Sequence, residues 1–132
     1  MTATINGNYI NLATWRKNGK RVNTPVWFAE GDTKGIYYLF SSGEAGKVKR
    51  IRNSNYAEIA PCDVTGKLQG PWLSVHASLL ERKADIDKAK KAIAAKYGWQ
   101  SRMIDFFSAM ARKKQKRCYI MLQVDKNQTN GS

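Results

Sequence analysis

Short β-forming segments separated by strong turn signals fill the first 80 residues of this chain, and this pattern constrains the fold most. The Asn18-Gly19 pair between the first two segments is typical of a hairpin turn. Five such strands within about 80 residues predict a small antiparallel barrel. The segments are Tyr9 to Trp15, Arg21 to Ala29, Ile36 to Phe40, Tyr56 to Ala60 and Trp72 to Leu80.

The second segment has an unusual feature for a strand, since it contains Pro25. Its apolar and small residues alternate, with Thr24 and Val26 on one face and Asn23 and Trp27 on the other. Proline has no N–H to donate to a neighbouring strand. We therefore expect this strand to lie at an edge of the sheet or to carry a bulge at Pro25.

The second part of the chain changes to a helical pattern after Glu81. Apolar residues at helical spacing predict an amphipathic helix capped by Asp85, followed by a second helix capped by Ser101. The residues of these patterns are Ile86, Ala89, Ile93 and Tyr97, then Met103, Ile104, Phe107 and Met110. Cys118 to Val124 is again strand-like, and a polar tail begins at about residue 125. We predict a mainly β domain over residues 1–132, with about six mostly antiparallel strands, a short basic helix and a helical pair before the last strand.

Composition narrows the classes of protein but does not choose among ligands. A net charge of +13 on 132 residues attracts phosphates, nucleic acids and anionic membranes alike. No stretch approaches the roughly 18 apolar residues of a membrane span, and the first residues lack a signal-peptide pattern, so we expect a cytoplasmic location. The two cysteines, Cys62 and Cys118, have no metal-ligand spacing, and we expect free thiols and no metal site.

The segment from Ser41 to Asn53 combines a small flexible loop with four cations. Hydroxyls, accessible backbone N–H groups and cations suit a bound phosphate, and the start of a short helix attracts anions further. A solvated helix face explains the same cations, and both interpretations stay open at this point. The groups concerned are Ser41, Ser42, Gly43 and Gly46 in the loop, then Lys47, Lys49, Arg50 and Arg52.

Several motifs in order carry a resemblance to a known family. They are Tyr9-Ile-Asn-Leu-Ala-Thr14, Arg21-Val-Asn-Thr-Pro-Val-Trp-Phe28, Gly46-Lys-Val-Lys-Arg-Ile-Arg52 and Ala60-Pro-Cys-Asp63. Over roughly Tyr9 to Glu81 the chain resembles the pyridoxamine 5'-phosphate oxidase-like family, in particular its small F420- or FMN-dependent oxidoreductases. The resemblance implies a split β-barrel homodimer that binds two coenzyme molecules in clefts between the protomers.

The resemblance also assigns residues to the coenzyme. It implies that Lys47 and Arg50 bind the phosphate, with Ser41 and Ser42 as hydroxyl partners and Lys49 and Arg52 as further cations. The strand that lines the flavin or deazaflavin ring corresponds to Asn23, Thr24, Pro25, Val26 and Trp27. The chain has only about eight residues before the first strand, where relatives commonly have a helix, so the substrate stays unassigned.

The sequence contains no catalytic triad, metal cluster or paired carboxylates. This absence fits a redox enzyme whose coenzyme carries the hydride to or from a small molecule, and we name no catalytic residue. We expect the single histidine, His76, to be structural. Two alternatives stay open: a carrier or sensor that binds flavin without turnover, and a non-enzymatic basic barrel that binds nucleic acid through aromatics among its cations. The residues do not distinguish FMN from F420.

Overall fold

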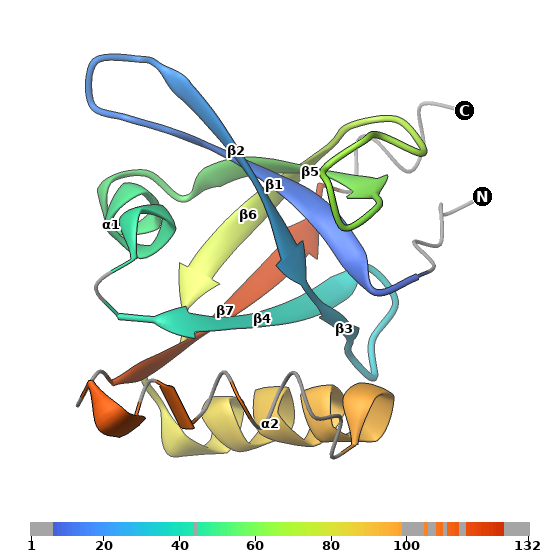
Figure 1. Cartoon of the computed structure of the whole chain (residues 1–132), viewed down its shortest axis with the longest axis vertical. Helices are drawn as coiled ribbons and strands as arrows, with labels where there is room; N and C mark the ends of the chain where they lie inside the picture. Colours follow the sequence, from blue (N-terminus) through green and yellow to red (C-terminus); the bar gives the residue numbers. More distant parts are fainter. Residues whose placement is uncertain are drawn as a thin grey trace.

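The computed structural model describes residues 7–43, 45–98 and 116–125, together with positions 105, 108, 109 and 111–113. Figure 1 shows a strongly curled sheet with one helix at its open end and a second helix below it. The seven strands follow the order β2-β1-β5-β6-β7-β4-β3, and every neighbouring pair is antiparallel. They are β1 (Tyr9–Trp15), β2 (Arg21–Trp27), β3 (Ala29–Glu30), β4 (Ile36–Ser42), β5 (Tyr56–Cys62), β6 (Leu73–Leu79) and β7 (Arg117–Val124). The prediction of a β-dominant barrel is confirmed.

The predicted second strand is two strands, because the chain changes partner at Phe28. Up to Trp27 it pairs with β1, and from Ala29 it pairs with β4 at the opposite edge of the sheet. The hydroxyl of Tyr97 accepts a hydrogen bond from the Phe28 N–H (3.0 Å) and donates to the Phe28 carbonyl (2.5 Å). A side chain thus satisfies the backbone groups of the residue between the two strands. This change of partner, which turns about six strands into seven, was not predicted.

The same crossing explains why the barrel is split. The two edges of the sheet meet at Phe28, while β2 and β4 diverge on the other side of it (Figure 1). Pro25 lies opposite Asn11 of β1 and has no strand on its other side. The expectation that Pro25 lies at an edge is therefore confirmed.

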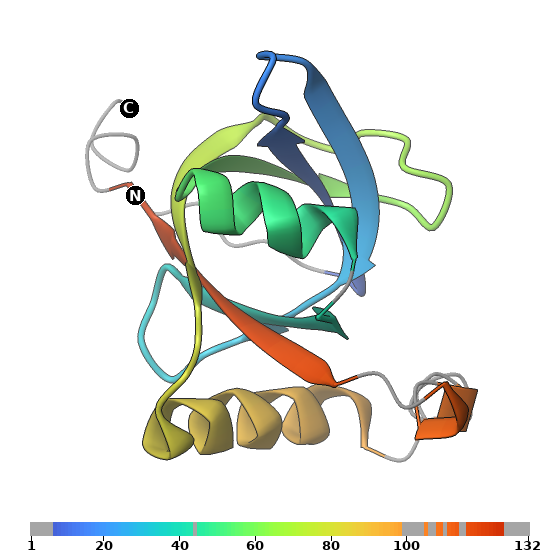
Figure 2. The ribbon, with the colours of Figure 1, turned by 90° about the vertical axis from the view of Figure 1, so that its left-hand side faces the viewer.

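Helix α1 (Gly46–Asn53) closes one end of the barrel. Figure 2 looks onto it and shows how it crosses the opening of the curled sheet. Val48 and Ile51, three residues apart on one face, are buried in the inner core. That core includes large apolar residues from the strands, among them Ile10, Leu12, Leu39, Ile59, Ile120 and Leu122. Burial of each such side chain contributes about 1.5–3 kcal/mol.

Helix α2 (Lys83–Tyr97) packs on the outside of the sheet, against β3, β4 and β7. Its buried residues are Ala89, Ile93 and Tyr97, as the helical spacing predicted. The prediction that Asp85 caps it is wrong: the N-cap is Arg82, and the Ile86 N–H already donates to the Arg82 carbonyl (3.0 Å). Asp85 lies in the first turn, where a carboxylate is still favourable.

Two predictions rest on residues outside the described part of the chain: the cap and apolar residues of the second helix (Ser101, Met103, Ile104, Phe107 and Met110) and the tail beyond residue 125. The described positions 105, 108, 109, 111 and 112 are helical. None of the helices that the structure describes is long and apolar enough to span a membrane. One boundary differs as well: β5 continues through Pro61 to Cys62, so the loop before β6 is shorter than predicted.

Candidate functional site

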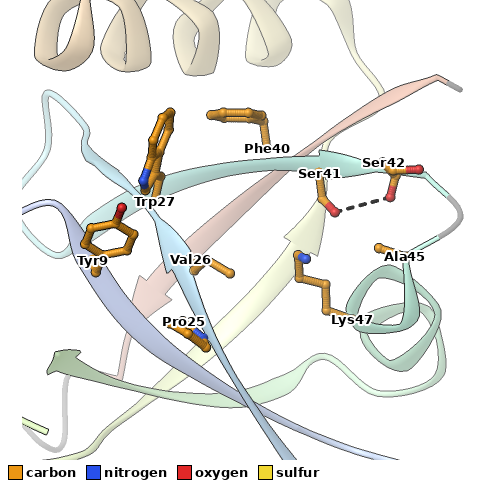
Figure 3. A pocket seen from close by; sticks show the side chains of 9 residues that line it. All are labelled: Tyr9, Pro25, Val26, Trp27, Phe40, Ser41, Ser42, Ala45 and Lys47. Carbon is orange, nitrogen blue, oxygen red and sulfur yellow. Dashed lines mark hydrogen bonds between the residues drawn. The ribbon is translucent and has the colours of Figure 1, made fainter. Parts of the chain in front are cut away.

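A cavity of about 380 Å³ opens along the split between β2 and β4 (Figure 3). It has two chemically distinct ends, an aromatic one and a polar one. Its lining comprises Tyr9, Pro25, Val26, Trp27, Phe40, Ser41, Ser42, Ala45 and Lys47. We call it the seam cavity.

The aromatic end is built around Trp27. Its indole makes edge contacts with Tyr9 (centroids 6.5 Å apart) and Phe40 (6.4 Å), and it stacks on Tyr97 at 5.2 Å with planes 19° apart. Tyr97 in turn is fixed by its hydrogen bonds to Phe28. The cavity therefore has a wall of rings in which Trp27 stacks on Tyr97 of α2, and such a wall suits a planar ligand.

The polar end is formed where β4 leads into α1. Ser41 is buried, and its hydroxyl donates to the Ser42 carbonyl (3.3 Å). The N-cap residue Ala45 has no side chain that could cap the helix. The first N–H groups of a helix have no partner within it, so this uncapped start carries partial positive charge.

Lys47 brings a full positive charge to the same end, and in Figure 3 its side chain extends toward Ser41. Burial lowers the pKa of this ammonium below its usual range, and the nearby charge of Arg50 lowers it further. No carboxylate of the described residues forms an ion pair with it. A partly desolvated cation without a counter-ion is unfavourable alone and attracts an anion.

Arg50 faces a different neighbour. Its Nε donates to the Thr14 hydroxyl (2.6 Å), and its guanidinium lies so close to Gly46 that a Cβ there would be 2.7 Å from Nη1. Burial lowers its pKa, and the charge of Arg16 adds to this. Glycine at position 46 thus allows Arg50 to pack across the start of α1, next to the seam cavity rather than in its lining.

The structure brings together six of the eleven residues predicted for the site, namely Pro25, Val26, Trp27, Ser41, Ser42 and Lys47. The other five do not line the cavity. Lys49 and Arg52 are exposed on α1, Arg50 packs as described, and Asn23 and Thr24 lie nearer the hairpin. Asn23 instead accepts a hydrogen bond from Arg21 Nε (3.0 Å).

Sequence reasoning missed Tyr9, Phe40 and Ala45 as lining residues. The hairpin register does indicate that Tyr9 lies beside the predicted site residue Trp27. A hairpin that places Trp15 opposite Arg21 places Tyr9 opposite Trp27, because antiparallel register is fixed by the turn. Phe40 depends on the approach of two strands that are not hydrogen-bonded to each other, and the sequence holds no signal for that.

Other candidate groups lie away from the seam cavity. His76 is exposed on β6, and Cys62 and Cys118 are free thiols, as expected. Within the described ranges, no three histidine, cysteine, aspartate or glutamate side chains form a metal site.

The sequence matches no protein-family model and no curated protein. Solved structures do share its architecture. An FMN-binding protein related to pyridoxamine 5'-phosphate oxidase from Nostoc punctiforme has a TM-score of 0.61 at 15% identity, over 89% of this chain and 70% of that chain. HutZ, the heme storage protein of Vibrio cholerae, has a TM-score of 0.65 at 19% identity, over 90% and 82%.

A third structure is a protein of the pyridoxinephosphate oxidase family from Clostridium acetobutylicum, related to general stress protein 26 of Bacillus subtilis. Its TM-score is 0.63 at 13% identity, over 89% of this chain and 75% of that chain. At such identities the likeness shows the fold. The chain has the split-barrel fold of pyridoxamine 5'-phosphate oxidase-like proteins, as the motifs predicted, and this fold is shared by an FMN-binding protein and a heme storage protein.

Proposed function

We propose that this protein binds a phosphate-bearing flavin, FMN or the deazaflavin F420, in the seam cavity and transfers a hydride to or from a small molecule. One observation carries the proposal: a single cavity has a ring-lined wall at one end and Lys47, without a carboxylate partner among the described residues, at the other. A flavin phosphate is divided in the same way, into a planar tricycle and an anion.

Each part of the cavity has a role in this proposal. Lys47, the hydroxyls of Ser41 and Ser42 and the first N–H groups of α1 hold the phosphate. Pro25, Val26 and Trp27 line the ring, and Tyr9 and Phe40 close its apolar end. The bound coenzyme supplies the hydride chemistry, while the chain binds it, orients it and excludes water.

The remaining predicted cations act from outside the lining. Arg50 is a positioning residue, because its bond to Thr14 and its contact with Gly46 fix the start of α1. Lys49 and Arg52 contribute long-range attraction for anions. We further propose a cytoplasmic homodimer in which a second copy covers the open side of the seam cavity.

Heme is the competing ligand, since a neighbour of the same fold is a heme storage protein. Heme iron is commonly held by histidine, cysteine, methionine or tyrosine. Among the described residues of the lining, Tyr9 is the only one of these types, and the single histidine of the chain is on the outer surface of β6. The described lining thus contains a cation and hydroxyls for a flavin phosphate, but only one side chain, Tyr9, that could bind heme iron.

Titration with matched ligands tests the proposal. FMN, F420, riboflavin and hemin are added separately to the purified protein, and binding is followed by calorimetry and by ligand absorbance. We expect saturable binding of FMN or F420, and FMN at least about 10-fold tighter than riboflavin, which lacks the phosphate. Equal affinity for FMN and riboflavin contradicts the phosphate site, and saturable binding of hemin alone contradicts the flavin assignment.

Turnover separates an enzyme from a carrier or sensor. The flavin-loaded protein is reduced chemically, and its reoxidation by a panel of small electron acceptors is compared with that of the same free coenzyme. Faster reoxidation by a subset of acceptors is the expected result. Rates equal to the free coenzyme for every acceptor favour a carrier.

A further inference from the structure

A row of aromatic and polar residues crosses the outer face of the sheet from β2 to β7. Helix α2 lies toward the other end of the sheet, against β3, β4 and β7 (Figure 1). The pairing register places Arg21 beside Trp15, and His76 between Tyr56 and Gln123. The rings of Trp15 and Tyr56, 5.3 Å apart, join the two halves. Five adjacent strands therefore each contribute one residue to a single row, which we call the cross-strand row.

Interactions between side chains hold this row in place. The Arg21 guanidinium lies 5.2 Å from the ring centroid of Trp15 and 4.3 Å from that of Trp72, and it forms an ion pair with Glu58 (3.1 Å). The Tyr56 hydroxyl bonds to Glu58 (2.6 Å) and Ser74 (3.0 Å). Tyr56 is nevertheless 48% exposed. An oriented ring that remains accessible is a ready stacking surface.

A second hollow of about 480 Å³ lies along the row from Tyr56, its middle member, to Gln123 at its end on β7. It shares no residue with the seam cavity. Hydroxyl, imidazole, amide and carboxylate groups surround it, so donors and acceptors are available beside an aromatic ring. The lining residues are Tyr56, Ser74, Val75, His76, Gln123, Val124 and Asp125.

Cations flank the other end of the row. The β1–β2 hairpin carries Arg16, Lys17 and Lys20, all exposed, directly beyond Trp15 and Arg21. The carboxylate of Glu58 is already paired with Arg21. This charge favours a polyanion over a second copy of a chain whose net charge is +13.

We propose that this outer face binds single-stranded RNA. A base stacks on Tyr56 and enters the hollow, and the phosphates run toward the cations of the hairpin. Stacking on exposed aromatics above a basic track is how proteins bind single strands. The mixed polar groups around the hollow, including Ser74 and Gln123, can pair with the 2'-hydroxyl that distinguishes RNA from DNA. This inference concerns a surface separate from the seam cavity and does not depend on the flavin.

Fluorescence anisotropy with a labelled oligouridine of about 12 nucleotides tests the stacking surface. Tyr56→Ala should weaken binding by about 5- to 150-fold, the range for loss of one stacked base, whereas Tyr56→Phe should keep affinity within about 2-fold. Thermal melting confirms that each variant is folded. Tyr56→Ala with unchanged affinity overturns the proposal, as does wild-type protein with no saturable binding.

Two matched lysine pairs test the track. Lys17→Ala/Lys20→Ala should reduce the slope of log affinity against log salt by about 1.4, about 0.7 for each lost phosphate contact. Lys88→Ala/Lys91→Ala removes the same charge from exposed positions of α2 and should leave the slope unchanged. Equal effects of the two pairs would mean attraction by net charge alone and overturn the assignment to this face.

Competitors and mass measurement test the choice of occupant. Unlabelled single-stranded DNA of matched sequence and duplex RNA should compete at least about 10-fold less well than oligouridine. Equal competition by either one contradicts recognition of single-stranded RNA. Light scattering is run on the same variants, and a Tyr56→Ala protein that changes from dimer to monomer would assign the face to a second copy and overturn the proposal.

Discussion

The seam cavity and the outer face both combine aromatic rings with cations, but their cations are in opposite situations. Lys47 in the cavity is partly desolvated, and no described carboxylate pairs with it. Arg21 on the outer face has Glu58 as an ion-pair partner and stacks on Trp72. A cation that already has a carboxylate partner within the chain therefore holds its neighbouring side chains in place. A cation without such a partner is available to bind an anionic ligand.

The largest expected effect is the loss of coenzyme affinity when Lys47 is replaced. Lys47→Ala should weaken binding of FMN or F420 by about 1.5–3 kcal/mol, the range of a charged hydrogen bond, or roughly 10- to 150-fold. Calorimetry measures it. Lys49→Ala removes an exposed cation two residues away and is the matched control, with a change below about 2-fold. Similar losses of affinity in both variants would show that Lys47 contributes no more to binding than an exposed cation does.

A second prediction concerns the wall behind the cavity. Tyr97→Phe leaves the buried Phe28 N–H and carbonyl without the hydroxyl between them, and an unsatisfied buried group costs about 1–3 kcal/mol. The free energy of unfolding from urea denaturation should fall by about that amount. Tyr119→Phe makes the same change in another buried tyrosine that packs with Tyr97 in the cluster under α2, and is the control. A Tyr97→Phe protein as stable as wild type would contradict the role of this hydroxyl at the strand crossing.

Replacing Arg21, the ion-paired cation of the outer face, should reduce the free energy of unfolding less than Tyr97→Phe does. Arg21→Ala removes a partly exposed ion pair and two contacts with indole rings, and we expect a loss of about 0.5–1 kcal/mol. Flavin affinity should stay unchanged, since Arg21 is outside the lining. A drop in flavin affinity in this variant would mean that the two regions are coupled.

The smallest effect is a dependence of stability on pH. Burial lowers the pKa of Lys96 to about 8, where its ammonium lies 3.5 Å from the centroid of the Phe28 ring. Between pH 8 and 10 the unfolded chain then binds more protons at this residue than the folded chain. The free energy of unfolding should therefore rise with pH in this window. Tyr97, whose pKa is raised to about 12, has the opposite effect above pH 10.

Urea denaturation at several pH values measures the free energy of unfolding of wild type and Lys96→Met. The variant should show a smaller rise between pH 8 and 10, because Lys47, whose pKa burial also lowers, still contributes in the same direction. An identical rise in both proteins would assign it to another group.

The sequence predicted the parts of this site that depend on local pattern. Asn18-Gly19 fixed the hairpin, Pro25 marked an edge strand, and the glycine-containing loop before Lys47 led into a helix as expected. The anion site at that helix start stays a prediction. The crossing at Phe28 was beyond such reasoning, because it rests on a hydroxyl 69 residues away in the sequence. The family resemblance assigned Arg50 to the phosphate together with Lys47, but the bond of Arg50 to Thr14 depends on how α1 meets β1.

A crystal structure of the protein with saturating FMN or F420 tests the central claim most directly. The account predicts the phosphate within hydrogen-bond distance of Lys47 Nζ at the start of α1, and the ring beside Trp27. A coenzyme bound with its phosphate elsewhere, or an empty seam cavity in such crystals, would contradict it.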